Sequence, residues 1–271
     1  CGRPPTASKA PVRAAPHCPP LLQTATPPPA QVRDLKEAEF AAGALRKGGF
    51  SAEDLTVGGY SCKELRDGGY SAADCKAADH AAVALRSAGY AVRALRNAHF
   101  TCAELTAAEF TTKELLSGGY NAAELRAVGF EAKALRTAGC GIQQLRDAQF
   151  TASQLRAAKF STKEMRSVGF SASDLEAIGC TASELRVGGF SASEVVAADV
   201  PLYDMRAGGF PAADMRAIGC SVDDLKSAGY SAKELKAGGF DAEALKAGGF
   251  SAHELKMVHF TCAEARISAL K

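Results

Sequence analysis

The chain has 271 residues, of which 47% are hydrophobic and 23% are charged, with a formal net charge of +2 and no tryptophan. This is the composition of an ordinary folded protein and excludes a wholly disordered chain. No apolar run approaches the roughly 18 residues of a membrane span, and the first residues do not have the layout of a signal peptide.

Residues 1–30 form a leader that differs from the rest of the chain. The leader holds nine of the eleven prolines and three bases, Arg3, Lys9 and Arg13, without one acid. Because proline interrupts both helices and sheets, we expect an extended or disordered segment that acts as a tether, a docking arm or the remains of an organelle-targeting region. Residues 31–271 have a net charge of −1, so any general attraction to polyanions lies in the leader.

Residues 31–270 divide into twenty-four consecutive decapeptides without an insertion or deletion. Position 1 is Ser, Thr, Asn or Asp in sixteen repeats, and position 4 is acidic in seventeen. Position 5 is Leu in eighteen, position 6 is Lys or Arg in nineteen, position 9 is Gly in fifteen, and position 10 is Phe or Tyr in eighteen. A tandem-repeat domain over residues 31–271 is therefore predicted.

Each repeat carries the signals for one short helix. Ser or Thr followed three residues later by Glu is a capping box, which satisfies the free N–H groups at a helix start. Good helix formers occupy the next positions, and Gly at position 9 suits the left-handed residue just after a helix end. These signals predict a two-turn helix over positions 2–8 of each repeat.

The aromatic residue at position 10 is expected to join two helices. Schellman geometry brings it onto the Leu of its own repeat, and a hydrophobic staple brings it onto the Leu of the next. Phe240 should thus contact both Leu235 and Leu245, and Phe250 has the same role one repeat later. These four residues are predicted to belong to the repeat core.

Helices of this length are marginal alone, so they must stack. The predicted fold is an all-α solenoid of about 24 two-turn helices, with ten residues per helix and twenty residues per two-helix layer, because the non-aromatic residues at position 10 fall in alternate repeats. A pentapeptide-type β-helix is the alternative, since apolar residues recur every five positions. It would bury the charges at position 3, such as Lys63 and Asp223, which is unfavourable.

Positions 4 and 6 lie on opposite sides of each helix, so parallel stacking should place the bases of one helix beside the acids of another. We expect pairs such as Arg166 with Glu184 or, in the opposite hand, Glu164 with Arg186. Exposed ion pairs contribute only about 0–1 kcal/mol each, so they would set register rather than stability.

Positions 3 and 7 should point outward, and they are the variable positions of the repeat. Partner binding is expected where outward or boundary positions become apolar, and the stretch from Ser191 to Met205 departs furthest from the pattern. A locally decayed repeat that folds normally would give the same departure. The candidate partner-binding residues are Leu116, Val196, Leu202, Tyr203 and Met257.

We find no catalytic constellation, so no enzyme activity, catalytic residue, cofactor or metal site is expected. The many Gly-Gly pairs end helices and do not belong to phosphate-binding loops. His253, His259 and Cys262 are the nearest approach to a metal cluster, but their different repeat positions should make them diverge. The nine cysteines include no C-x-x-C pair and are expected to be small buried residues, with a disulfide framework or a zinc site as the alternatives.

The repeat resembles decapeptide repeats of the type A-G-[FY]-[ST]-A-x-E-L-[RK], which occur in proteins of algae and other protists. The resemblance covers about 240 residues. It implies an α-helical repeat array, and no activity comes with it.

These features predict a structural protein that binds other proteins. We expect a non-catalytic scaffold or linker subunit that bridges protein subunits of a larger assembly, without a small-molecule substrate and with only indirect membrane contact. The expected location is intracellular, and the leader suggests a membrane complex of a plastid or mitochondrion. A modular single-stranded nucleic-acid-binding array is the alternative, because two variable residues per repeat resemble a base-reading code.

Overall fold

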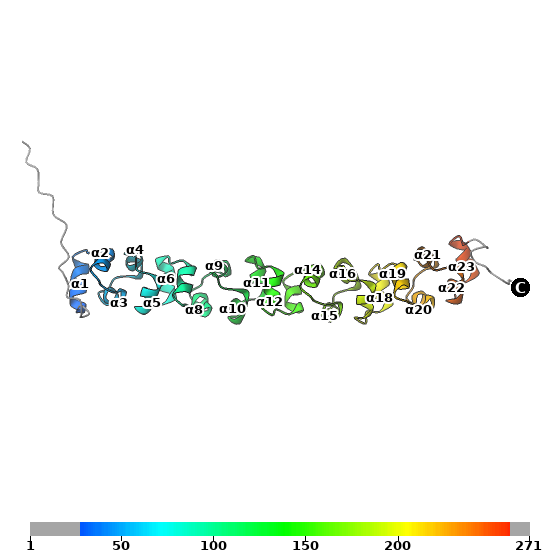
Figure 1. Cartoon of the computed structure of the whole chain (residues 1–271), viewed down its shortest axis with the longest axis horizontal. Helices are drawn as coiled ribbons and strands as arrows, with labels where there is room; N and C mark the ends of the chain where they lie inside the picture. The colour runs from blue at the N-terminus through cyan, green and yellow to red at the C-terminus, as the bar shows by residue number, and fades with distance from the viewer. Residues whose placement is uncertain (1–27, 261–271) are drawn as a thin grey trace, which may run out of the picture. The chain divides into compact units, whose positions relative to one another are not determined.

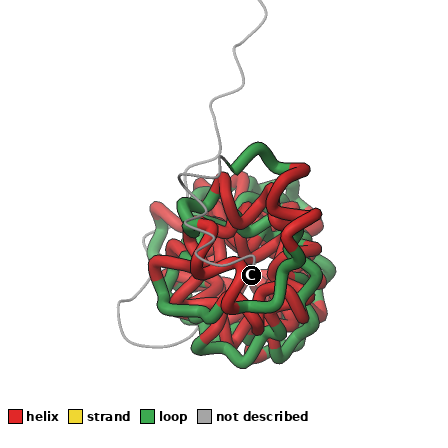
Figure 2. The backbone as a smooth tube through the Cα atoms, turned by 90° about the vertical axis from the view of Figure 1, so that its right-hand side faces the viewer, coloured by secondary structure: helices red, strands yellow, loops and turns green. Residues whose placement is uncertain are grey.

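The computed structural model describes residues 28–260, in which helices alternate with short loops and no strand occurs (Figure 2). The predicted all-α fold is thus confirmed, and for these residues the β-helix alternative is wrong. The first helix begins at Pro29, and residues 1–27 of the leader lie outside the described residues. So does the whole of the twenty-fourth repeat, residues 261–270.

The chain divides into two compact units, Cys1–Tyr120 and Asn121–Lys271, whose helices are labelled in Figure 1. The described helices of the first unit are α1 (Pro29–Glu37), α2 (Ala42–Lys47), α3 (Ala52–Val57), α4 (Cys62–Asp67), α5 (Ala72–Ala77), α6 (Ala82–Ala88), α7 (Val92–Asn97), α8 (Cys102–Ala107) and α9 (Thr112–Ser117).

The described helices of the second unit continue the same spacing. They are α10 (Ala122–Ala127), α11 (Ala132–Thr137), α12 (Ile142–Asp147), α13 (Ala152–Ala157), α14 (Thr162–Ser167), α15 (Ala172–Glu176), α16 (Ala182–Val187), α17 (Ala192–Val196), α18 (Leu202–Ala207), α19 (Ala212–Ala217), α20 (Val222–Ser227), α21 (Ala232–Ala237), α22 (Ala242–Ala247) and α23 (Ala252–Met257).

Most helices begin at position 2 as predicted but end at position 7, one residue early. The reason is the Schellman turn that closes each repeat. In the repeat from Ser231 to Phe240, the N–H of Gly239 donates to the carbonyl of Lys236 at 3.0 Å. The N–H of Phe240 donates to the carbonyl of Leu235 at 3.1 Å. These bonds replace the regular helical pattern after position 7.

The predicted capping box opens most helices. In α21, Ser231 Oγ accepts from the backbone N–H of Glu234 at 3.3 Å, and the Glu234 carboxylate accepts from the N–H of Ser231 at 2.8 Å. Each bond satisfies an N–H group that has no partner within the helix. Helices that follow Ala or Pro at position 1, such as α6 and α18, have no such side-chain cap.

Position 9 adopts the left-handed conformation in every described repeat, whether or not it is glycine. Gly239, for example, has φ of 83°. Eight other residues share this conformation at the same position: Glu39, Asp79, His99, Glu109, Gln149, Lys159, Asp199 and His259. The turn is therefore imposed by the stack rather than by the glycine.

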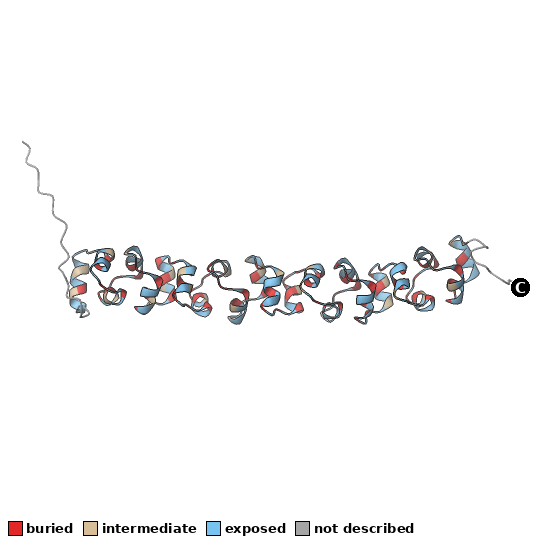
Figure 3. Cartoon of the chain, viewed as in Figure 1, coloured by how far each residue is buried: buried red, intermediate tan, exposed pale blue. Residues whose placement is uncertain are grey.

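Within each unit, helices two repeats apart pack against each other, as α4 does on α6 and α14 on α16. Buried residues lie on the helix faces that meet in this packing (Figure 3). Of the predicted core residues, Leu235 and Leu245 are fully buried, Phe250 is buried and Phe240 is half-buried. Position 5 thus forms the centre of the core.

Hydroxyl groups of tyrosines at position 10 confirm the predicted twenty-residue layer. The Tyr230 hydroxyl donates to the carbonyl of Phe210 at 2.9 Å, and that of Tyr70 donates to Phe50 at 2.7 Å. The other alternating set makes the same bond, since Tyr60 donates to Phe40 at 2.7 Å. The two sets of repeats therefore stack in the same way.

Small residues at position 8 let neighbouring helices approach. A Cβ atom built on Gly118 would lie 2.2 Å from Val92 Cγ1, and one on Gly188 would lie 2.7 Å from Thr162 Oγ1. Val92 lies at position 2 of the repeat that is two repeats before that of Gly118, and Thr162 has the same relation to Gly188. In these repeats the C-terminal end of a helix thus docks against the start of the helix two repeats before it, and glycine at position 8 leaves room for the larger residue at position 2.

Candidate functional site

Positions 3 and 7 are exposed in almost every described repeat, as predicted from their variability. The most exposed large hydrophobic residues occur there: Val57, Val83, Val187, Tyr203 and Met257. Substitutions at these positions leave the buried framework untouched. They are therefore the positions at which the surface differs along the chain.

The predicted partner-binding residues are spread over four helices. Leu116 is half-buried in α9 of the first unit, whereas Met257 is exposed in α23 near the end of the described residues. Val196 in α17 is 38% exposed and Tyr203 in α18 is 67% exposed, with half-buried Leu202 beside Tyr203. Three of the five residues thus lie on two helices that contact each other.

One exposed residue on a helix that contacts α17 and α18 was not among the residues predicted from the sequence. Val187 at position 7 of α16 is 74% exposed, and α16 contacts both α17 and α18. A scan of position 7 for apolar residues would have found it. We refer to Val187, Val196, Leu202 and Tyr203 as the α16–α18 patch.

The basic residue at position 6 makes a set of contacts that recurs along both units. The guanidinium of Arg166 donates to the carbonyl of Gly189 and lies over the ring of Phe190, 4.9 Å from its centroid. It also pairs with the Glu194 carboxylate at 3.2 Å. The Arg166 side chain therefore caps the end of α16, two repeats after its own, and reaches the first turn of α17.

The cation and the aromatic ring are always separated by 24 residues. The observed pairs are Lys36–Tyr60, Arg46–Tyr70, Lys76–Phe100, Arg86–Phe110, Arg96–Tyr120, Arg126–Phe150, Arg136–Phe160, Arg146–Phe170, Arg166–Phe190, Arg206–Tyr230, Arg216–Phe240, Lys226–Phe250 and Lys236–Phe260.

The predicted ion pairs are wrong in spacing. Arg166 pairs with Glu194 rather than Glu184, and Glu184 pairs with Arg156 at 3.4 Å. The base thus meets the acid three repeats later, because the helix end two repeats later lies between the base and the expected partner. The same 28-residue spacing recurs in Lys36–Glu64 and Arg206–Glu234.

This network is interrupted beside the α16–α18 patch. Glu176 and Val196 stand where other repeats have a base, and the ring positions 24 residues later are Val200 and Cys220. In the first unit Thr56 replaces a base, and its Oγ1 lies 2.8 Å from Nε2 of His80, which replaces the ring. Base and ring are thus lost together at these three places, 24 residues apart in each case.

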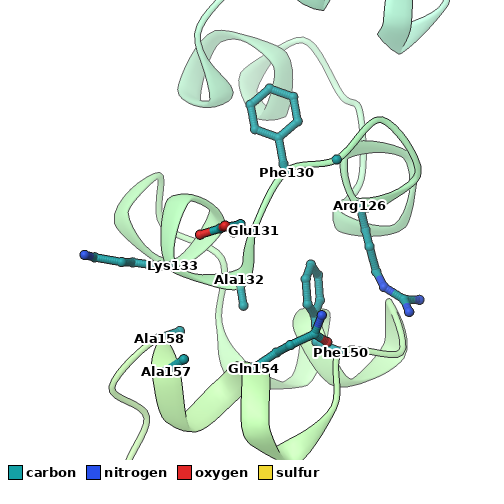
Figure 4. Close-up of a pocket in the computed structure, with 10 residues that line it drawn as sticks. Arg126, Phe130, Glu131, Ala132, Lys133, Phe150, Gln154, Ala157 and Ala158 are labelled. Carbon is teal, nitrogen blue, oxygen red and sulfur yellow. The ribbon is translucent and has the colours of Figure 1, made fainter.

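Two cavities are lined by the same repeat positions. One of 450 Å³ is bordered by Arg126, Phe130, Phe150 and Gln154 (Figure 4). The other, of 270 Å³, is bordered by the corresponding Arg206, Phe210, Tyr230 and Glu234. The same repeat positions thus border both cavities, and the residue beside the arginine at position 4 is Gln154 in one and Glu234 in the other. The linings also differ at Glu131 and Pro211, at Lys133 and Ala213, at Phe150 and Tyr230, and at Ala158 and Gly238.

The described cysteines are free thiols, and most are buried. Burial raises the pKa of Cys62 to about 12 and also raises the pKa of Cys140 and Cys180. A thiol with a raised pKa holds little thiolate at neutral pH and is a weak nucleophile. The predicted role of these cysteines as small core residues is therefore consistent with their surroundings.

Between residues 28 and 260, no three His, Cys, Asp or Glu side chains are grouped so that they would hold a metal ion. His253 and His259 belong to this part of the chain, whereas Cys262 lies outside the described residues. In the same range, none of the helices has the length and apolar character that crossing a membrane requires.

The fold and the repeated surface define an all-α tandem-repeat protein. The sequence matches the family described as decapeptide repeat region over residues 30–98, 89–162, 159–228 and 199–269. The chain therefore belongs to this decapeptide repeat family, as its resemblance to such repeats indicated. No curated protein and no solved structure matches it.

Proposed function

We propose that the protein is a non-catalytic scaffold or linker subunit that binds other proteins through its exposed repeat positions. The supporting observation is the contrast between position 5, which is buried in almost every described repeat and is most often Leu, and positions 3 and 7, which are exposed and variable. Repeat proteins commonly use such surfaces to bind partners without disturbing the stack. The basic leader supports, as part of this proposal, an assembly in a plastid or mitochondrion.

The α16–α18 patch is the proposed principal contact. Val187 and Tyr203 place large apolar groups in solvent, and aromatic residues are enriched at the centres of protein interfaces. Val196 stands where most repeats have a base, so no charge has to be desolvated at that position. A protein partner with an apolar contact surface fits these features.

A nucleic-acid partner is less well supported. Phosphate binding requires Lys and Arg side chains that are free to approach the backbone. Here the bases at position 6 are engaged by helix-end carbonyls and aromatic rings, as Arg136 is by the carbonyl of Ala158 and the ring of Phe160.

Native co-purification of the full chain tests the proposal. We expect a partner protein at a fixed stoichiometry that is lost in Tyr203→Ser and Val187→Ser and retained in Val83→Ser, a matched control because Val83 is a similarly exposed valine in the first unit. A chain that is monomeric in its native extract would contradict the scaffold role. Tight, salt-sensitive binding to random RNA after neutralisation of Arg3, Lys9 and Arg13 would favour the nucleic-acid alternative.

A further inference from the structure

Arg126 is a position 6 base without the carboxylate that pairs with Arg156 and Arg166. Its Nη1 donates to the carbonyl of Ala148 at 3.0 Å, and the guanidinium lies 5.5 Å from the centroid of the Phe150 ring. The position 28 residues later, which is Glu184 for Arg156 and Glu194 for Arg166, is Gln154. Two of the three usual contacts are thus present and the counter-ion is missing.

The glutamine keeps the local fold intact. Gln154 Oε1 accepts from the N–H of Thr151 at 2.9 Å, and Thr151 Oγ1 accepts from the N–H of Gln154 at 3.3 Å. These are the bonds of a capping box, which Gln forms as well as Glu. The substitution therefore removes a charge without removing the helix cap.

The cavity at Arg206 contains the carboxylate that the cavity at Arg126 lacks. At Arg206 the Nη2 atom lies 3.5 Å from Glu234 Oε2, so the cation of that cavity is neutralised within the chain. At Arg126 the corresponding group is a neutral amide, and the cavity is larger, 450 Å³ compared with 270 Å³. An incoming carboxylate can thus take the electrostatic role that Glu234 has beside Arg206.

The segment that follows Arg126 is rich in bases. Between Arg126 and Lys163 the chain has seven bases and two acids, whereas residues 164–260 have nine bases and fourteen acids. One of the two acids, Glu131, lines the cavity, but its carboxylate points away from Arg126 (Figure 4). Clustered charge of one sign raises the local concentration of ligands of the opposite sign.

The walls of the cavity suit an amino-acid side chain. Phe150, Ala157 and Ala158 provide apolar surface at this cavity, whereas the ring of Phe130 points away from them (Figure 4). A glutamate or aspartate side chain has the matching order of groups, with methylenes behind one negative charge. A phosphate group would present two charges to one guanidinium and no apolar part to the ring.

We propose that this cavity binds a carboxylate side chain of an acidic peptide segment in a partner protein. The proposal rests on the proposed scaffold function and names the chemistry of one partner contact. The carboxylate pairs with the Arg126 guanidinium, and its methylenes contact the Phe150 ring. The site would add a specific charged contact to the apolar α16–α18 patch of the same unit.

Binding of a fluorescein-labelled hexaglutamate peptide to the purified full chain tests this site. Gln154→Glu supplies the missing counter-ion and retains the capping box, so it should fold normally and weaken peptide binding by about tenfold. Ala84→Glu is the matched control. It adds the same charge at the same repeat position, but the residue 28 positions earlier is Thr56 rather than a base, so binding should change less than about twofold.

A variant that removes a counter-ion, instead of adding one, provides a second measurement. Glu234→Gln should leave Arg206 without its counter-ion, as Arg126 is, and increase the number of peptides bound per chain. Unchanged binding in Gln154→Glu, equal weakening in Ala84→Glu, or no gain in Glu234→Gln would each overturn the proposal. So would tighter binding of inorganic phosphate or of a random single-stranded oligonucleotide that is also lost in Gln154→Glu.

A failure of the carboxylate site can be distinguished from a failure of the proposed scaffold function. Peptide binding is measured on the isolated chain, whereas the scaffold role is measured by the subunits that accompany it in a native extract. A chain that binds the peptide but has no native partner would contradict only the proposed function. A chain with a native partner that ignores the peptide would contradict only the carboxylate site.

Discussion

The guanidinium of Arg166 lies over the ring of Phe190 and pairs with Glu194, so one side chain links its own repeat to the repeats two and three positions later. Its own helix is α14, the carbonyl that it caps follows α16, and the carboxylate belongs to α17. The backbone hydrogen bonds within a helix of six residues are too few to keep it stable without packing against other helices. Repeated side-chain contacts of this kind therefore supplement the buried leucines.

Arg166→Gln is expected to lower the free energy of unfolding by about 1–2 kcal/mol. The variant loses a charged hydrogen bond to a carbonyl and a cation–π contact, while the exposed ion pair adds little. Urea unfolding followed by circular dichroism measures the change. Arg166→Lys should recover most of the loss, because Lys226 contacts the Phe250 ring in the same way, at 4.7 Å from its centroid.

A double-mutant cycle separates the ring from the other contacts. If Arg166→Gln costs as much in the background of Phe190→Leu as in the wild type, the ring contact contributes nothing. That outcome would contradict the role given to the 24-residue spacing.

Gly118→Ala is expected to destabilise the first unit because the new methyl group would lie 2.2 Å from Val92 Cγ1. Overpacking of this kind costs about 1–3 kcal/mol. The backbone is not the cause, since Gly118 has φ of −72°, which alanine adopts freely. Thermal unfolding should show a lower melting temperature than in the wild type.

The matched test is the double variant Val92→Ala with Gly118→Ala. The pair would then be alanine with alanine, as Ala82 and Ala108 are at the same two positions. We expect the double variant to be more stable than Gly118→Ala alone. A further loss on adding Val92→Ala would show that the two residues do not share one packing site.

The local features of the fold were predictable from the sequence because each is encoded within one repeat. The capping box of Ser231 and Glu234, the Schellman turn at Gly239 and the burial of Leu235 all follow from residues less than ten positions apart. The ion pairs were not predictable in the same way. Whether Arg166 meets Glu184 or Glu194 depends on how successive helices are rotated, and no single repeat encodes this rotation.

Part of the missed network was nevertheless visible in the sequence. The joint loss of base and ring at Glu176 and Val200, and again at Val196 and Cys220, is a correlation at a spacing of 24 residues. The cavity at Arg126 was not visible, because it requires knowing that Gln154 faces that arginine. The partner-binding residues stay a prediction, for which the structure gives location and exposure.

The left-handed turn at position 9 provides a paired test of backbone strain. Gln149 has φ of 62°, a conformation that costs an ordinary residue roughly 1–2 kcal/mol relative to glycine. Gln149→Gly is therefore expected to raise the free energy of unfolding, by about 1 kcal/mol at most after the entropy of glycine is counted. Urea unfolding of the variant and the wild type measures this difference.

The converse change is Gly129→Ala in the same unit. Gly129 has φ of 95°, and nothing lies within 4 Å of a Cβ atom built on it, so any loss of stability comes from the backbone alone. We expect this variant to be less stable than the wild type. If both changes leave stability unaltered, the left-handed turn is not a source of strain.

Glu194 is expected to make the stability of the stack depend on pH in the acid range. The hydrogen bond from the backbone N–H of Ser191, followed by that from the Ser191 hydroxyl and the charge of Arg166, lowers the pKa of this carboxyl. A carboxyl whose pKa is lower in the folded state stabilises the fold above its unfolded pKa, about 4.3 for glutamate. The stabilisation is lost as the pH falls through the folded pKa.

Glu194→Gln removes this dependence and should isolate the contribution of one carboxylate. At pH 7 the variant is expected to be less stable than the wild type, by up to about 1 kcal/mol because the group is exposed. The difference should shrink as the pH falls below about 4, since Glu194 of the wild type is then neutral as well. Urea unfolding at a series of pH values measures the free energy of unfolding of the variant and of the wild type. A difference between the two that stays constant down to pH 2 would mean that the charge of Glu194 does not stabilise the fold.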